Sequence, residues 1–182
     1  MSANEFEKLW SLLNESRGQL PIEQAVIKAL QSDAISLSPE LLFQATHSFG
    51  KDFGDMFITP KLLVGFLTRL LANRNINSML DPTCGSGVLL HVITDQHPNS
   101  IAHGVEINSD VATVADRLLS QRATVFRGNF LEQKENLLSE YDLIISEPPF
   151  NVRLPGPIRF SESHDPIQGD LHEVLAPGRR VV

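Results

Sequence analysis

The sequence of 182 residues contains a single cysteine, Cys84, so an internal disulfide bond is excluded. No apolar run approaches the ~18 residues that a membrane-spanning helix requires. The first ten residues, MSANEFEKLW, include early acidic residues and lack the apolar core of a secretion signal. Together these absences predict a cytoplasmic protein without a membrane segment.

Basic residues are also scarce, because 15 Lys and Arg face 22 Asp and Glu and leave a net charge of −7. A protein that holds nucleic acid by itself usually presents a basic surface, since phosphate neutralisation supplies most non-specific affinity. The 42% of hydrophobic residues is that of an ordinary globular protein. If the substrate is DNA, a partner subunit or sequence outside this chain is expected to supply most of the affinity for DNA.

The six histidines show no spacing typical of a metal site, and we predict no bound metal. His91 and His97 fall within and at the end of a helical pattern. Cys84 lies inside a glycine-rich turn without a His and Asn or Asp set of known spacing. A packed small side chain is therefore its expected role, rather than a nucleophile.

Helical periodicity dominates the first part of the chain. Residues 6–13, 22–30 and 39–47 each place apolar side chains at the spacing of one helix face. Proline opens the second and third segments, and Ser38 is a good N-cap for the third. We therefore predict a helical N-terminal region over 1–57, in which the glycine-punctuated residues 49–57 form a loop.

The pattern changes to alternating strands and helices from residue 78, after one more helix that starts near residue 60. Such alternation indicates a parallel sheet with crossover helices, an α/β fold of the Rossmann-like kind. Residues 151–170 are predicted to form a mobile loop, and 179–182 resemble a fifth strand that stops as it begins. The predicted strands end near residues 83, 107, 129 and 146, and the helices span 87–96 and 109–121.

The segment DPTCGSG, residues 81–87, is a glycine-rich turn between a strand and a helix. Gly85 and Gly87 allow a tight turn and a close approach of the backbone to a ligand. Nucleotide-like cofactors bind at such turns in doubly wound sheets. Asp81, at the strand end, can meet the cationic amine of a methionine moiety. A plain turn with a capping Asp is the alternative, and the glycines alone do not separate the two.

Polar residues also end the next two strands. Glu106 lies ~20 residues past the glycine turn, where an acid accepts hydrogen bonds from ribose hydroxyls. Its register with that turn favours this role over a solvated acid. Asn129 is placed to contact the adenine edge of a cofactor, with Phe130 on its face, although a simple turn Asn after Gly128 is an equal alternative.

The segment SEPPF, residues 146–150, is the catalytic candidate. Pro148 and Pro149 remove backbone donors and fix both φ angles, which leaves rigid carbonyls as acceptors. A planar amine can donate to one carbonyl and to Glu147, while Phe150 stacks on the ring. Taken alone, EPPF favours a structural turn, but its place downstream of the glycine turn and Glu106 favours the amine site.

These segments together resemble the adenine-specific DNA methyltransferases, in particular the modification subunit of type I restriction–modification systems. LWSLLNESRG near the start is similar to their helical N-terminal region. GDMFITP, residues 54–60, resembles their G-x-F-x-TP segment, and DPTCGSG resembles their DPxCGSG. The resemblance implies a methyltransferase domain over 58–182 and S-adenosylmethionine as cofactor. The residues implied to line the cofactor are Phe57, Thr59, Pro60, Asp81, Thr83, Gly85, Gly87, Glu106 and Asn129.

The resemblance further implies methyl transfer to the exocyclic amine of adenine in DNA, with the base taken out of the duplex. Glu147 and the Pro148 carbonyl would accept hydrogen bonds from the amine, Pro149 would hold the corner rigid, and Phe150 would hold the flipped ring. Sequence choice would belong to a separate specificity subunit, and no membrane is implied as a partner.

Two departures from this family keep alternatives open. The family has Asn, Asp or Ser where Glu147 stands, and a misplacement of ~1 Å can cost on the order of a hundredfold in rate. The family's sheet also continues past a fifth strand, so this chain is expected to be a fragment, a truncated gene product or a degenerate member. The alternatives are a non-catalytic cofactor-binding module and a protein glutamine methyltransferase, which also uses a Pro-Pro-aromatic corner.

Overall fold

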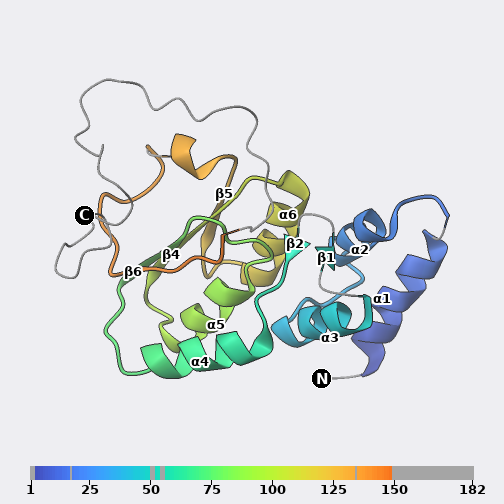
Figure 1. Ribbon diagram of the computed structural model, residues 1–182, viewed down its shortest axis with the longest axis horizontal. Helices are drawn as coiled ribbons and strands as arrows, with labels where there is room; N and C mark the ends of the chain where they lie inside the picture. Colours follow the sequence, from blue (N-terminus) through green and yellow to red (C-terminus); the bar gives the residue numbers. More distant parts are fainter. Residues whose placement is uncertain (1–2, 17, 50–51, 54–55, 134, 149–182) are drawn as a thin grey trace, which may run out of the picture. The chain divides into compact units, whose positions relative to one another are not determined.

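The computed structural model describes residues 3–16, 18–49, 52–53, 56–133 and 135–148. Pro149, Phe150, the predicted loop 151–170 and the predicted strand 179–182 lie outside the described residues. Three N-terminal helices, a small hairpin and a four-stranded sheet with its helices follow one another along the chain (Figure 1). No helix in the described part is long and apolar enough to cross a membrane.

The N-terminal region is helical, as its periodicity predicts. Its helices are α1 (Ala3–Glu15), α2 (Ile22–Leu30) and α3 (Pro39–Phe49). The Ser38 hydroxyl accepts a hydrogen bond from the Leu41 N–H at 3.2 Å, which is the side-chain cap that the sequence predicts for α3.

The segment predicted as a loop at 49–57 instead contains a short antiparallel hairpin. Its strands are β1 (Asp52–Phe53) and β2 (Met56–Phe57), with Phe53 opposite Met56. The Met56 side chain is 1% exposed and lies in the core shared with the N-terminal helices. Burial of Met56 gives this segment a fixed place that its glycines alone do not indicate.

The main sheet is parallel, with strands in the order β5-β4-β3-β6. Strand β3 (Ser78–Asp81) lies between β4 (Ile101–Glu106) and β6 (Leu143–Ile144), and β5 (Thr124–Arg127) is next to β4. Helix α4 (Lys61–Leu71) precedes β3, while α5 (Val88–Gln96) and α6 (Ser109–Leu119) are the crossovers. The chain therefore reverses its direction of strand addition at β3, which is where ligands bind in such sheets.

Strand β6 is shorter than the apolar segment YDLIIS suggests. Only Leu143 and Ile144 are in strand conformation, and Ile144 is 63% exposed. Within the described part of the chain, β6 pairs with β3 alone, so its other edge has no strand beside it.

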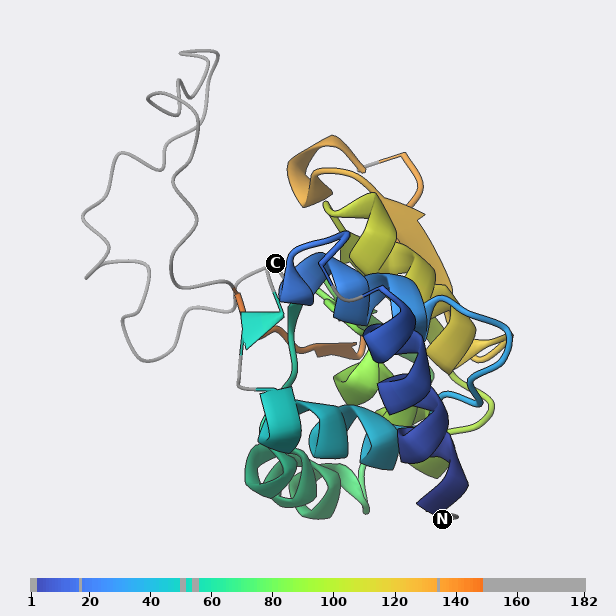
Figure 2. The ribbon, with the colours of Figure 1, turned by 90° about the vertical axis from the view of Figure 1, so that its right-hand side faces the viewer.

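Two clusters of buried apolar side chains form the core. The first joins the N-terminal helices to α5 and α6 through residues such as Leu9, Leu42 and Val114. The second lies between the sheet and its helices, around Met79 and Leu90. Figure 2 shows α1 and α2 in front of α6, and α2 and α6 are in contact. The predicted boundary after residue 57 stays a prediction.

Candidate active site

The functional candidates meet at the carboxyl edge of the sheet. Asp81 is the last residue of β3 and Glu106 the last residue of β4, while Asn129 follows β5 and Glu147 follows β6. Because the strands are parallel and β3 is central, Asp81 has Glu106 on one side and Glu147 on the other. The negative charges of Glu106 and Glu147 both act on Asp81. The structure thus brings three sequence-predicted carboxylates to one place.

The glycine turn between β3 and α5 requires its glycines. Gly85 has a φ of 54° and Gly87, the N-cap of α5, has a φ of 80°, a region that residues with a side chain rarely adopt. An added Cβ at Gly85 would lie 3.2 Å from the Phe57 carbonyl oxygen, and one at Gly87 would lie 3.0 Å from Leu119 Cδ1. The backbone of Phe57 therefore runs directly beside the turn.

Glu106 has a structural partner that the sequence did not suggest. Its Oε2 accepts a hydrogen bond from the Gly85 N–H at 3.0 Å, and its Oε1 accepts one from the Asn108 N–H at 2.8 Å. The residue is 9% exposed. A carboxylate oxygen has more than one acceptor site, so these bonds fix the glycine turn and still leave acceptor capacity for a ligand hydroxyl.

Asp81 is buried, with 2% of its surface exposed, and its Oδ1 accepts a hydrogen bond from the Thr83 N–H at 3.0 Å. Burial, followed by the charges of Glu106 and Glu147, raises the pKa of Asp81 to about 7, against the opposing effect of the Thr83 bond. A cation placed beside Asp81 would favour its ionised form. The site therefore suits a ligand that carries positive charge.

Ser146 is a residue of the site that sequence reasoning missed. Its hydroxyl lies 2.8 Å from the Thr83 hydroxyl, and this hydrogen bond joins the glycine turn to the segment that leads into the two prolines. The one sequence feature that could have pointed to Ser146 is its position at the start of SEPPF. That signal is weak, because the pairing depends on β3 and β6 being neighbours.

Glu147 is half-buried and Pro148 is exposed. The Oε2 atom of Glu147 is buried and accepts no hydrogen bond from the residues that the structure describes. Pro149 and Phe150, the other two predicted catalytic residues, lie outside the described residues.

The remaining predicted residues lie around this edge. Thr59 is buried, Pro60 is the N-cap of α4, and the Phe57 side chain is 37% exposed. Asn129 caps the short 3-10 helix η1 (Phe130–Glu132), and its Oδ1 accepts from the Leu131 N–H at 3.2 Å. The capping role engages one acceptor of Asn129 and leaves its amide N–H groups for other contacts.

Cys84 is buried within the glycine turn. Burial, with the nearby charges of Asp81 and Glu106, raises the pKa of its thiol well above the ordinary value. Its Sγ would lie 2.8 Å from a Cβ added at Gly104. Cys84 is therefore a packed thiol against β4, as the sequence predicts.

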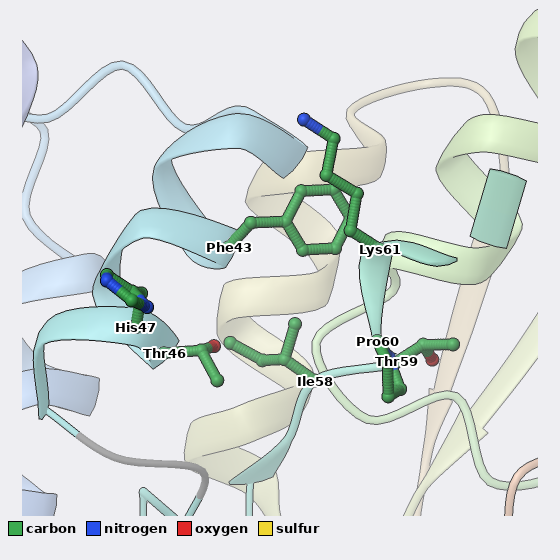
Figure 3. A pocket seen from close by; sticks show the side chains of 7 residues that line it. All are labelled: Phe43, Thr46, His47, Ile58, Thr59, Pro60 and Lys61. Atoms are coloured by element: carbon green, nitrogen blue, oxygen red, sulfur yellow. The ribbon is translucent and has the colours of Figure 1, made fainter. Parts of the chain in front are cut away.

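A cavity of about 380 Å³ lies between α3 and the start of α4 (Figure 3). Of the predicted site residues that the structure describes, Thr59 and Pro60 line it. Asp81, Glu106 and Glu147 do not line it. Its lining among the described residues is Phe43, Thr46, His47, Ile58, Thr59, Pro60 and Lys61.

The fold and the strand-edge site define a Rossmann-like methyltransferase domain. Residues 59–156, more than half of the chain, match the methyltransferase small domain family. The chain belongs to this family.

Known proteins similar to this chain agree with that assignment. Modification methylase CviBIII of Paramecium bursaria Chlorella virus NC1A is 29% identical over 106 residues, which cover 56% of this chain and 27% of the relative. This chain thus spans about a quarter of the length of that relative.

Solved structures share the fold. A protein of Listeria monocytogenes assigned as a class I S-adenosylmethionine-dependent methyltransferase has a TM-score of 0.54 and 18% identity, over 80% of this chain and 59% of that one. The O-methyltransferase TomG of Streptomyces achromogenes, solved with S-adenosylmethionine, has a TM-score of 0.50 and 14% identity, over 81% of this chain and 63% of that one. The predicted fold class is confirmed, and the family supports S-adenosylmethionine as the predicted cofactor.

Proposed function

We propose that this chain binds S-adenosylmethionine at the carboxyl edge of β3 and β4 and transfers its methyl group to the exocyclic amine of adenine in DNA. One observation carries the proposal. Glu106 and Glu147 flank Asp81 at the switch point of the sheet, so an acid suited to ribose and an acid suited to an amine lie on either side of the residue that opens the glycine turn.

The residues on the cofactor side fit such a ligand. Gly85 and Gly87 place no side chain at two positions of the turn, and Glu106 holds that turn in place while it retains acceptor capacity for ribose hydroxyls. Asp81 would face the cationic amine of the methionine moiety, and Asn129 would contact the adenine. S-adenosylmethionine supplies a methyl group made electrophilic by its sulfonium. Phe57, Thr59, Pro60 and Thr83 would line the rest of the cofactor.

The residues on the substrate side would orient the amine. Glu147 and the Pro148 carbonyl would accept its two hydrogens, and Phe150 would stack on the flipped base. The hydrogen bond between Ser146 and Thr83 holds this corner against the glycine turn. The chain would thus accelerate transfer mainly by positioning the amine nitrogen toward the methyl group.

The similarity to a modification methylase supports DNA as the substrate and a restriction–modification-type system as the setting. The net charge of −7 argues that this chain does not hold DNA by itself. A basic protein partner, such as a specificity subunit, would supply the grip and the choice of sequence.

Isotope-labelled methyl transfer tests this function. Because the chain is not expected to hold DNA tightly without its partner, the purified chain is incubated at high concentration and low ionic strength with labelled S-adenosylmethionine and unmethylated DNA. The nucleosides are then separated and identified by mass spectrometry. We expect label in N6-methyladenine, and its loss in Glu106→Gln. Label in cytosine, or in protein alone, would contradict the proposed substrate, and cofactor binding without any transfer would instead support the non-catalytic module.

A further inference from the structure

The polar side chains at the carboxyl edge share a local hydrogen bond. Each accepts from the backbone N–H two residues further along the chain. Asp81 accepts from Thr83 at 3.0 Å, and Glu106 accepts from Asn108 at 2.8 Å. Asn129 follows the same rule with Leu131 at 3.2 Å. The backbone thus satisfies part of the acceptor capacity of each of these side chains.

Glu147 occupies the equivalent place after β6, but the residues that follow it cannot supply the same N–H donor. The next two residues are Pro148 and Pro149, and neither has an N–H group. Accordingly, the Oε2 atom of Glu147 is buried and accepts no hydrogen bond within the described part of the chain. A buried acceptor without a donor is costly, so this oxygen is set to receive a proton donor from a ligand.

The described residues around Glu147 do not offer that donor. The neighbouring Ser146 hydroxyl is paired with the Thr83 hydroxyl at 2.8 Å. The charged groups that act on the neighbouring Asp81 are also carboxylates, those of Glu106 and Glu147. The unpartnered Oε2 atom therefore has room for a donor that only a ligand would bring.

We infer that Glu147 Oε2 takes the proton that the substrate amine loses during methyl transfer, beyond accepting the hydrogen bond that orients the amine. This inference rests on the proposed function. The amine nitrogen forms a bond to the methyl carbon as the carbon–sulfur bond breaks and its electron pair passes to sulfur. The nitrogen, now positive, releases one proton to Oε2, and the resulting carboxylic acid returns that proton to water.

Glu147 is chemically suited to this step, whereas an amide at the same position is not. An asparagine or glutamine oxygen accepts a hydrogen bond but does not take up a proton at neutral pH. General base catalysis typically contributes on the order of 10²–10⁴ in rate. The exchange Glu147→Gln therefore keeps the shape and one acceptor and removes only the basicity and the charge.

A binding experiment tests whether the charge faces the reacting centre, and it needs no DNA. The probe is sinefungin, a cofactor analogue in which a carbon with an ammonium group replaces the methyl-bearing sulfonium. A hydrogen bond to a charged group is worth ~1.5–3 kcal/mol. Glu147→Gln should therefore weaken sinefungin binding roughly 10-fold or more, while the affinity for S-adenosylhomocysteine stays within about twofold.

Glu140→Gln is the matched control, because it removes one exposed carboxylate that precedes β6. It should change neither affinity. Equal binding of sinefungin by the wild type and by Glu147→Gln would overturn the inference.

The rate of a single turnover tests the proton transfer itself. At saturating S-adenosylmethionine, Glu147→Gln should lower the rate of methyl transfer to DNA roughly 100-fold or more, and Glu147→Asp should keep more of the rate than Glu147→Gln. A rate for Glu147→Gln within about threefold of wild type would overturn the proton-transfer role of Glu147 and leave the proposed function standing. A wild type that binds cofactor and methylates no DNA would overturn the proposed function instead, and the role that rests on it.

Discussion

At the scale of single residues, Asp81 links the charge of the site to the stability of the fold. Its folded-state pKa is raised from the ordinary value of 3.8 to about 7 by burial and by two neighbouring carboxylates. The folded state therefore holds the proton more tightly than the unfolded state. Stability contributed by this group is fully present below the unfolded pKa and is lost as pH rises through the folded pKa.

This linkage gives a prediction for Asp81→Asn. The variant cannot ionise at this position, so the free energy of unfolding of the variant relative to wild type should be larger at ~pH 8 than at ~pH 5. Urea denaturation at the two pH values measures both proteins. A difference between variant and wild type that is the same at both pH values would contradict the raised pKa. The comparison with wild type removes the contributions of other carboxylates.

At the scale of secondary structure elements, the start of α6 combines stability with the geometry of the site. The Asn108 side chain accepts hydrogen bonds from the N–H groups of Asp110 and Val111, at 3.0 and 3.3 Å. The backbone N–H of the same residue donates to Glu106. The cap of α6 thus lies directly beside the acid that holds the glycine turn.

Removal of this cap has a defined expected cost. Asn108→Ala should lower the free energy of unfolding by ~1 kcal/mol, because two N–H groups at the start of α6 lose their acceptor. Thr113→Ala is the control, since the Thr113 hydroxyl bonds only within α6 and is exposed; it should cost less than ~0.5 kcal/mol. Urea denaturation gives both values, and equal stability of Asn108→Ala and wild type would show that the cap contributes nothing.

The elements were largely predictable from the sequence, because periodicity and cap residues report on local structure. Ser38 and the strand-end positions of Asp81 and Glu106 are examples. The hairpin β1–β2 was not predictable, since it depends on where Met56 is buried. The bonds from Glu106 to Gly85 and from Ser146 to Thr83 join different strands and turns. They follow from the strand order, which local patterns do not encode.

For the described residues as a whole, the N-terminal helices pack against helix α6 of the methyltransferase sheet. The Arg117 guanidinium of α6 donates to the carbonyl oxygens of Leu30 and Ile35, the latter at 2.9 Å. Nearby, the Gln31 amide donates to the Asp110 carbonyl oxygen at 2.9 Å. A single buried cluster contains side chains of the N-terminal helices and of α5 and α6. These contacts predict that the two parts unfold together.

Arg117→Ala tests this coupling. Loss of the hydrogen bonds from its guanidinium should lower the free energy of unfolding by ~2 kcal/mol without separating the transition into two steps. The control is Arg69→Ala, whose guanidinium bonds only to the Gly65 carbonyl within α4 and is exposed. Urea denaturation followed by the fluorescence of Trp10 in α1 and by circular dichroism should give coincident curves. An earlier transition of Trp10 would show that the helices unfold independently.

The central claim is that the carboxyl edge of β3 and β4 binds S-adenosylmethionine, and calorimetric titration of this chain tests it most directly. Glu106→Gln is the informative variant, because an amide cannot accept from both Gly85 and Asn108 as the carboxylate does. Glu140→Gln serves as the control for loss of one charge. The account predicts saturable one-to-one binding that Glu106→Gln weakens ~10-fold or more, the loss expected for a hydrogen bond to a charged group. A folded wild-type chain that does not bind, or one that binds no better than Glu106→Gln, would contradict it.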